Sequence, residues 1–163
     1  MNASASAIEI HLQPGEFYFG DASARVRTLL GSCVAITLWH PTLLVGGMCH
    51  YMLPSRRQPA RQLDGKYADE AMELFLLETA RHHTRLEEYQ VKLFGGGTMF
   101  PGYGKKIAGA TVADNNVAAA HRLVARHRLQ LSAQDLGRSG HRNVIFDIGS
   151  GHVWVRHQRL TGS

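Results

Sequence analysis

Cys33 and His50 are the residues whose types and spacing are best suited to chemistry. Cys33 follows two small residues, Gly31 and Ser32, which leave its thiol room to meet a substrate. The thiolate is the nucleophilic form of cysteine, and a neighbouring imidazole removes the thiol proton or lowers its pKa. The same imidazole can then protonate a leaving amine. The alternative is a packed thiol beside a histidine whose hydrogen bonds are satisfied.

The segments that carry this pair predict an antiparallel hairpin. "VAITLWH" (34–40) and "VGGMCHYML" (45–53) are rich in strand-forming residues and flank a turn signal. A turn centred between positions 41 and 42 pairs Cys33 directly with His50. Opposed residues have Cβ atoms about 4.5–5.5 Å apart, so the imidazole would reach the thiol.

Cys49 takes the other face of this hairpin, because side chains alternate along a strand. The same register places it opposite Val34 and disfavours a Cys33–Cys49 disulfide, whereas a slip of one residue would exchange the faces. These are the only two cysteines in the chain, and a secreted domain built on disulfides usually carries more. We therefore expect reduced thiols and a cytoplasmic protein.

Two further groups could complete a reaction centre. The hydroxyl of Thr28 lies at the approach to the first strand of the hairpin and could orient the imidazole. The backbone N–H groups of Ser32 and Cys33 could stabilise the oxyanion of a tetrahedral intermediate.

The remaining elements predict an α+β fold, or α/β sandwich, with mixed, largely antiparallel β-sheet layers and two main helices. The apolar spacing and the Asp114 or Asn115 cap predict the helices. We expect one domain over residues 1–163, with a core of about 12–157. The predicted helices are 67–83 and 114–129, the predicted strands outside the hairpin are 89–95, 106–112, 129–136, 143–148 and 152–157, and 55–65 is a polar loop.

Composition excludes several classes of protein. No run of about eighteen apolar residues is present, so we expect no membrane insertion. The N-terminus lacks the basic and apolar pattern of a secretory signal. The net charge of +5 suits an acidic partner, but no zinc-finger spacing or aromatic RNA-binding signature accompanies it, so we expect no nucleic acid.

Metal and cofactor sites are not indicated. The ten histidines lack the spacing of zinc motifs. The glycines at 95–97 lack the Gly-Lys-Ser/Thr ending of a phosphate-binding loop. We expect no metal and no cofactor, and we expect these glycines to allow a tight turn or a close backbone approach.

Ordered motifs over roughly residues 12–157 resemble the CheD family of chemoreceptor glutamine deamidases. The motifs are "TLLGSCVAITLWHP", "GGMCHYMLP", "KYADEAM" (66–72), "KLFGGGTMF" (92–100), "DNN" (114–116) and "DLGRSGHRNVIFDIGSGHVWV" (135–155). The "DNN" stretch departs from the family's usual Arg-Asn, which leaves Asn116 as the matching residue.

The resemblance implies an α/β sandwich with a Cys-His-Thr catalytic set. The Cys and His of the motifs correspond to Cys33 and His50, and the Thr corresponds to Thr28. The glycine-rich motif would border the active site, which makes Ser32, Gly96 and Gly97 candidate substrate-binding residues. No cofactor or metal is implied.

The implied reaction converts specific receptor glutamines to glutamate through a cysteine thioester, in chemotaxis adaptation. The implied partners are the cytoplasmic domains of chemoreceptors and a CheC-like phosphatase. Receptor modification regions of this kind are helical and Glu-rich, and a basic rim would favour the encounter with them. Two alternatives stay open: a non-catalytic regulator that binds receptors or the phosphatase, and a receptor methylesterase.

Overall fold

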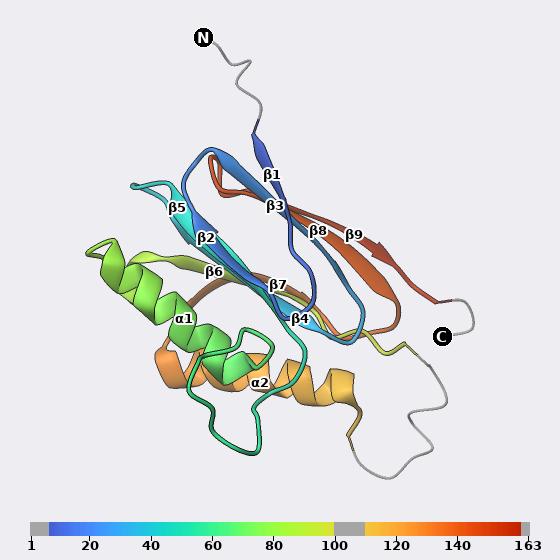
Figure 1. The fold of residues 1–163 in the computed structure, drawn as a ribbon. Coiled ribbons are helices and arrows are strands. Elements are labelled where there is room, and N and C mark those ends of the chain that lie inside the picture. The colour runs from blue at the N-terminus through green and yellow to red at the C-terminus, as the bar shows by residue number, and fades with distance from the viewer. Residues whose placement is uncertain (1–6, 100–109, 161–163) are drawn as a thin grey trace.

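The computed structural model describes residues 7–99 and 110–160, which form three layers (Figure 1). A four-stranded sheet of order β1-β3-β8-β9 packs on a five-stranded sheet of order β2-β5-β4-β6-β7, and α1 and α2 cover the far side of the second sheet. The α+β class with two main helices is therefore confirmed. The elements are β1 (Ile8–His11), β2 (Phe17–Gly20), β3 (Ala24–Leu30), β4 (Val34–His40), β5 (Val45–Tyr51), α1 (Ala68–Arg81), the 3-10 turn η1 (Leu86–Glu88), β6 (Gln90–Gly95), α2 (Val112–His127), β7 (Gln130–Leu136), β8 (His141–Asp147) and β9 (Val153–Gln158).

Both sheets are mixed and mainly antiparallel. The β1–β3 and β6–β7 pairs are parallel, and the other pairs are antiparallel. The first sheet has one face against the second sheet and one face open, so β3 and β8 alternate between buried and exposed residues.

The second sheet is covered on both faces, and this explains why apolar and polar residues alternate only weakly along its strands. Every residue of β5 is buried, as is nearly every residue of β4. One apolar core lies between this sheet and the helices, and another lies between the two sheets. Strands buried on both faces read as continuous apolar runs rather than as an alternating pattern.

The hairpin is confirmed, but its predicted register is wrong by two positions. His50 pairs with Ala35 and Cys49 pairs with Ile36, so Cys33 lies just beyond the last paired residue of β4. The turn is one residue further along than predicted, because Leu44 adopts a left-handed φ of 55° and donates a hydrogen bond back to His40. A shift of two positions preserves the faces, because side chains alternate with a period of two.

One other prediction is wrong, one lies largely outside the described residues, and three strands were missed. Helix α2 begins at Val112, where the Thr111 hydroxyl accepts a hydrogen bond from the Asp114 amide, so neither Asp114 nor Asn115 is the cap. The predicted strand 106–112 lies largely outside the described residues, and its last residue opens this helix. The N-terminal strands β1, β2 and β3 were not predicted.

No helix within the described ranges is long and apolar enough to cross a membrane.

Candidate active site

One strand of each sheet and the connection from β3 to β4 bring the predicted catalytic residues together between the sheets. Thr28 is a buried residue of β3, His50 is a buried residue of β5, and Cys33 lies in the short connection from β3 to β4. Cys33 and His50 share the face that points at the first sheet, and the half-buried thiol packs against the inter-sheet core. Cys49 lies on the opposite face, among the residues that contact the helices, as predicted.

A hydrogen-bond chain fixes the orientation and the tautomer of His50. The Thr28 hydroxyl donates its one proton to the carbonyl oxygen of Leu12 at 2.8 Å, and its oxygen lies 2.7 Å from Nδ1 of His50. Because the hydroxyl proton is already used, the oxygen must accept from Nδ1–H. The imidazole therefore carries its proton on Nδ1, and Nε2 is the basic nitrogen, which has no hydrogen bond to any residue of the described ranges.

The protonation states follow from burial. Desolvation lowers the pKa of His50 to about 4, and it raises the pKa of the Cys33 thiol above its ordinary value. Both groups are thus neutral near pH 7. No hydrogen bond joins Cys33 and His50 within the described part of the chain, so the pair is a thiol near a neutral base and not a preformed ion pair.

The connection between β1 and β2 holds both His50 and Thr28 from outside. The Gly15 N–H donates to the carbonyl oxygen of His50 at 2.8 Å, and the His50 N–H donates to the carbonyl oxygen of Glu16 at 3.2 Å. The same connection supplies the Leu12 carbonyl that anchors Thr28. One backbone segment therefore positions both the His50 imidazole and the Thr28 hydroxyl that orients it.

The predicted glycine-rich loop borders Cys33. The N–H of Gly96 donates to the carbonyl oxygen of Cys33 at 2.8 Å, and the N–H of Gly97 donates to that of Gly31 at 2.9 Å. Gly95 has a φ of 109°, and a Cβ there would collide with the Cys33 carbonyl oxygen. The N–H groups of Gly96 and Gly97 are therefore both bonded to backbone carbonyls at or near Cys33. A substrate-binding role for Gly96 and Gly97 stays a prediction.

Ser32 and Cys33 offer backbone donors beside the thiol. Their N–H groups make no hydrogen bond within residues 7–99 and 110–160, whereas their carbonyl oxygens accept from Asn116 and Gly96. Two unpaired N–H groups next to a nucleophile are the arrangement that an oxyanion requires.

Asn116 of α2 links Ser32, the neighbour of Cys33, to Met52, which directly follows the strand of His50, and this contact was not predicted. Its Nδ2 donates to the carbonyl oxygens of Ser32 at 3.0 Å and Met52 at 2.8 Å, and its backbone carbonyl oxygen accepts from the Tyr51 hydroxyl at 2.5 Å. Its side chain is 0% exposed. The sequence carried a signal, because Asn116 falls on the apolar stripe that also contains Ala113 and Ala119.

Replacing Asn116 with alanine should therefore disturb the site and the fold together. The change leaves two buried carbonyl oxygens unpaired, so we expect unfolding free energy to fall by about 1–3 kcal/mol. Misplacement of Cys33, the predicted nucleophile, should lower the catalytic rate by about tenfold to a hundredfold. Asn115→Ala, on the exposed side of the same helix, is the matched control. Thermal unfolding and initial rates measure the two effects, and wild-type rates in Asn116→Ala would contradict the expected role.

Arg142 of β8 holds the start of the glycine-rich loop through hydrogen bonds, and this role was not predicted. Its fully buried guanidinium donates to the carbonyl oxygens of Gly95 and Gly137 and pairs with Asp135 at 3.3 Å. Arg142 lies two residues before the buried Val144 in β8, so alternation places its side chain on the same buried face. This alternation was the signal in the sequence.

Metal binding finds no support in the described ranges. They contain no cluster of three or more His, Cys, Asp or Glu side chains that could hold a metal ion. Both cysteines are free.

Comparison with known proteins gives concordant results. The model of the family described as CheD chemotactic sensory transduction matches residues 52–157. Proteins named as chemoreceptor glutamine deamidases of the CheD type are similar over almost the whole chain. One from Pseudomonas syringae pv. tomato is 55% identical over 98% of this chain and 95% of its own length, and one from Pseudomonas savastanoi pv. phaseolicola is 56% identical over 98% and 90%.

More distant relatives show the same coverage. A CheD protein of Leptospira interrogans is 37% identical over 96% of both chains. Among solved structures, YlmD from Geobacillus stearothermophilus is 12% identical over 82% of this chain and 61% of its own, with a TM-score of 0.47, which is too distant to support an inference.

Proposed function

The chain belongs to the CheD family, and from that premise we propose that it hydrolyses the side-chain amide of specific chemoreceptor glutamines to glutamate. The names of its close relatives support the reaction and the substrate class. The observation that carries the assignment to this site is the Thr28–His50 hydrogen bond, which leaves Nε2 as a base on the face that Cys33 shares.

The first half of the reaction forms a thioester. Nε2 of His50 takes the Cys33 proton while Sγ attacks the amide carbon, and the N–H groups of Ser32 and Cys33 donate to the oxyanion. The imidazolium forms in a buried site, where the Nδ1–H bond to the Thr28 hydroxyl stabilises it. Nε2–H then protonates the leaving nitrogen, the carbon–nitrogen bond breaks, and ammonia departs.

The second half consumes one water molecule. His50, neutral again, takes a proton from water as its oxygen attacks the thioester carbon. The carbon–sulfur bond breaks, the proton returns to Cys33, and the glutamate side chain leaves. The net change is amide plus water to carboxylic acid plus ammonia, and no cofactor is required.

The test is an assay on a purified receptor cytoplasmic domain. Mass spectrometry should locate the converted glutamines, and ammonia should be released in equal amount. Release of methanol from a methylated receptor instead of ammonia would identify a methylesterase, and binding without turnover would identify a regulator. The proposal places the protein in the cytoplasm; a CheC-like phosphatase as a second partner is a further expectation of the family assignment.

Replacing Thr28 with valine should slow catalysis while leaving the nucleophile in place. The isosteric side chain cannot accept from Nδ1–H, so the imidazole loses its fixed tautomer and orientation. We expect kcat to fall by about tenfold to a hundredfold. Thr28→Ser keeps the hydroxyl and should recover most of the rate. Equal rates for the valine and serine variants would show that the hydroxyl has no such role.

A further inference from the structure

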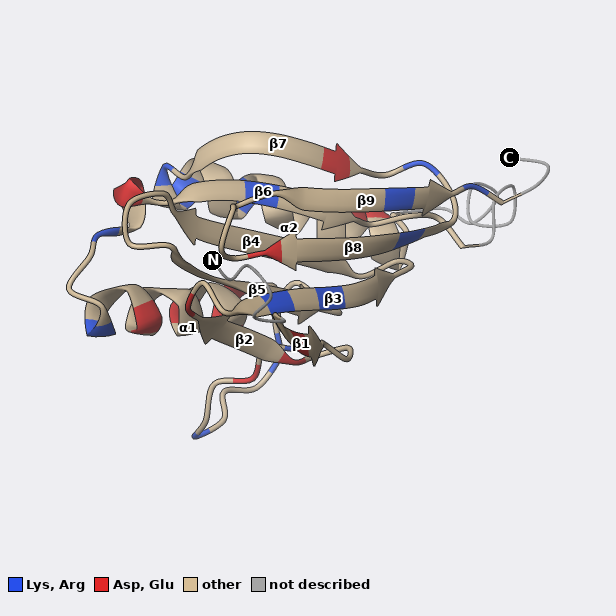
Figure 2. Cartoon of the chain, turned by 90° about the horizontal axis from the view of Figure 1, so that it is seen from above, with Lys and Arg blue, Asp and Glu red and all other residues tan. Residues whose placement is uncertain are grey.

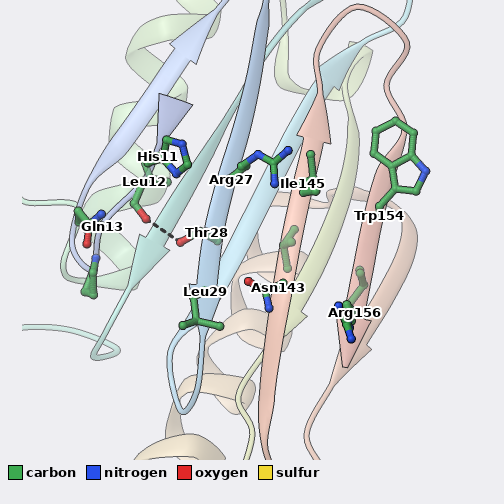
Figure 3. Close-up of a pocket in the computed structure, with 13 residues that line it drawn as sticks. His11, Leu12, Gln13, Arg27, Thr28, Leu29, Asn143, Ile145, Trp154 and Arg156 are labelled. Carbon is green, nitrogen blue, oxygen red and sulfur yellow. Dashed lines mark hydrogen bonds between the residues drawn. The ribbon is translucent and has the colours of Figure 1, made fainter. Parts of the chain in front are cut away.

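A groove of about 730 Å³ runs over the open face of the first sheet (Figure 3). Two rows of side chains cross it. One row joins Arg27, Ile145 and Trp154, and the other joins Leu29, Asn143 and Arg156, each residue being the register partner of the next. Cys33 and His50 lie on the opposite side of this sheet, and the proposed reaction does not use its open face.

The groove is basic. Arg27 and Arg156 line it, and no Asp or Glu is among its lining residues. Arg27 already pairs with Glu9 at 2.7 Å, whereas Arg156 has no ion pair within the described residues. Lys and Arg are marked on both β3 and β9, the strands from which these two arginines come (Figure 2). A carboxylate entering the groove would therefore meet positive charge, with an unpaired guanidinium at one side.

The groove also exposes large apolar side chains. Leu29 is 55% exposed and Trp154 is 49% exposed. Trp and Arg are the residues that most often dominate the binding energy of protein interfaces. Apolar surface beside arginine on an otherwise open sheet fits a polypeptide better than a small ion.

The groove lies against the reverse side of the strand that carries Thr28. Leu12 and Thr28 are among its lining residues, and their hydrogen bond orients His50 on the other side of β3. Leu29, the next residue along β3, is separated from Cys33 only by Leu30–Ser32. A polypeptide lying in the groove could therefore extend over the end of β3 to the thiol.

We propose that this groove is a docking surface for an acidic segment of the same protein substrate that presents the glutamine. The proposal rests on the proposed function. Glutamine hydrolysis itself creates a carboxylate, so a substrate with several sites becomes more acidic with each turnover. The arginines then favour a substrate that is already partly converted, which makes successive deamidations of one molecule faster than the first.

Arg156→Glu and Trp154→Ala test the docking surface with an intact receptor cytoplasmic domain and a short neutral glutamine peptide. We expect KM for the receptor domain to rise by about tenfold in Arg156→Glu, with kcat unchanged and the peptide kinetics unaltered. The exposed Arg85, outside the groove, gives the matched control Arg85→Glu. Added salt should raise KM of the wild type more than that of Arg156→Glu.

Binding measured without turnover separates this proposal from the reaction itself. In the Cys33→Ala background, Arg156→Glu should weaken binding of the receptor domain by a similar factor. Equal losses on domain and peptide, or no loss on either, would overturn the docking surface while leaving the reaction intact. A variant that instead changes the oligomeric state of the free protein would assign the groove to a contact between copies, and that result also overturns the proposal.

Discussion

Replacing Cys33 with alanine is expected to abolish ammonia release and glutamate formation while the protein remains folded. The thiol is the only proposed nucleophile, so without it the thioester does not form, and the rate should fall by at least about ten-thousandfold. Mass spectrometry of a receptor cytoplasmic domain measures the effect site by site. Cys33→Ser should be nearly as inactive, because a hydroxyl is a much weaker acid than a thiol and gives up its proton to the neutral imidazole far less readily.

Cys49 supplies the control. It lies on the other face of β5, and burial raises the pKa of its thiol to about 12. Cys49→Ala should therefore lower stability through a small cavity and leave the rate per folded molecule unchanged. Full activity in Cys33→Ala, or a loss confined to Cys49→Ala, would transfer the reaction to another residue and refute the proposed site.

The shared face of Cys33 and His50 was predictable, because an error of two positions in the register leaves alternating side chains on the same faces. The predicted register was wrong by two positions, yet Cys33 and His50 still share a face and Cys49 still lies opposite. The offset between Cys33 and His50 along the hairpin was not predictable. His50 pairs with Ala35, and Cys33 lies beyond the last paired residue of β4. The left-handed conformation of Leu44 moved the turn, and a leucine gives no sequence signal for that conformation.

The supporting contacts were hidden for a different reason. Asn116 and Leu12 act through long-range contacts, so no local pattern joins them to Cys33 or Thr28. Strand β1 is four residues long and largely exposed, which leaves little periodic signal. The layered class and the shared face of Cys33 and His50 were predictable from the sequence, whereas the contacts of the β1–β2 connection with His50 and Thr28 are visible only in the folded structure.

Replacing His50 with asparagine is expected to remove the base while keeping its structural contact. The asparagine amide can still donate to the Thr28 hydroxyl, but it cannot accept a proton from the thiol. The deamidation rate should fall by about a thousandfold. In the wild type, the low pKa of about 4 keeps the imidazole neutral, so the acid limb of kcat/KM should lie below the ordinary histidine value of 6.5. Initial rates over a pH series measure both effects.

Stability should report the same titration independently. Between pH 6.5 and about 4 the unfolded chain protonates this histidine and the folded chain does not, so the unfolding free energy falls as the pH falls. The full loss is about 3 kcal/mol. Urea denaturation across this window should show a steeper decline for the wild type than for His50→Asn, in which the other titrating groups are unchanged. Identical slopes, with an acid limb near 6.5, would mean that burial does not lower the pKa of His50 and would contradict the proposed resting state of a desolvated, neutral base.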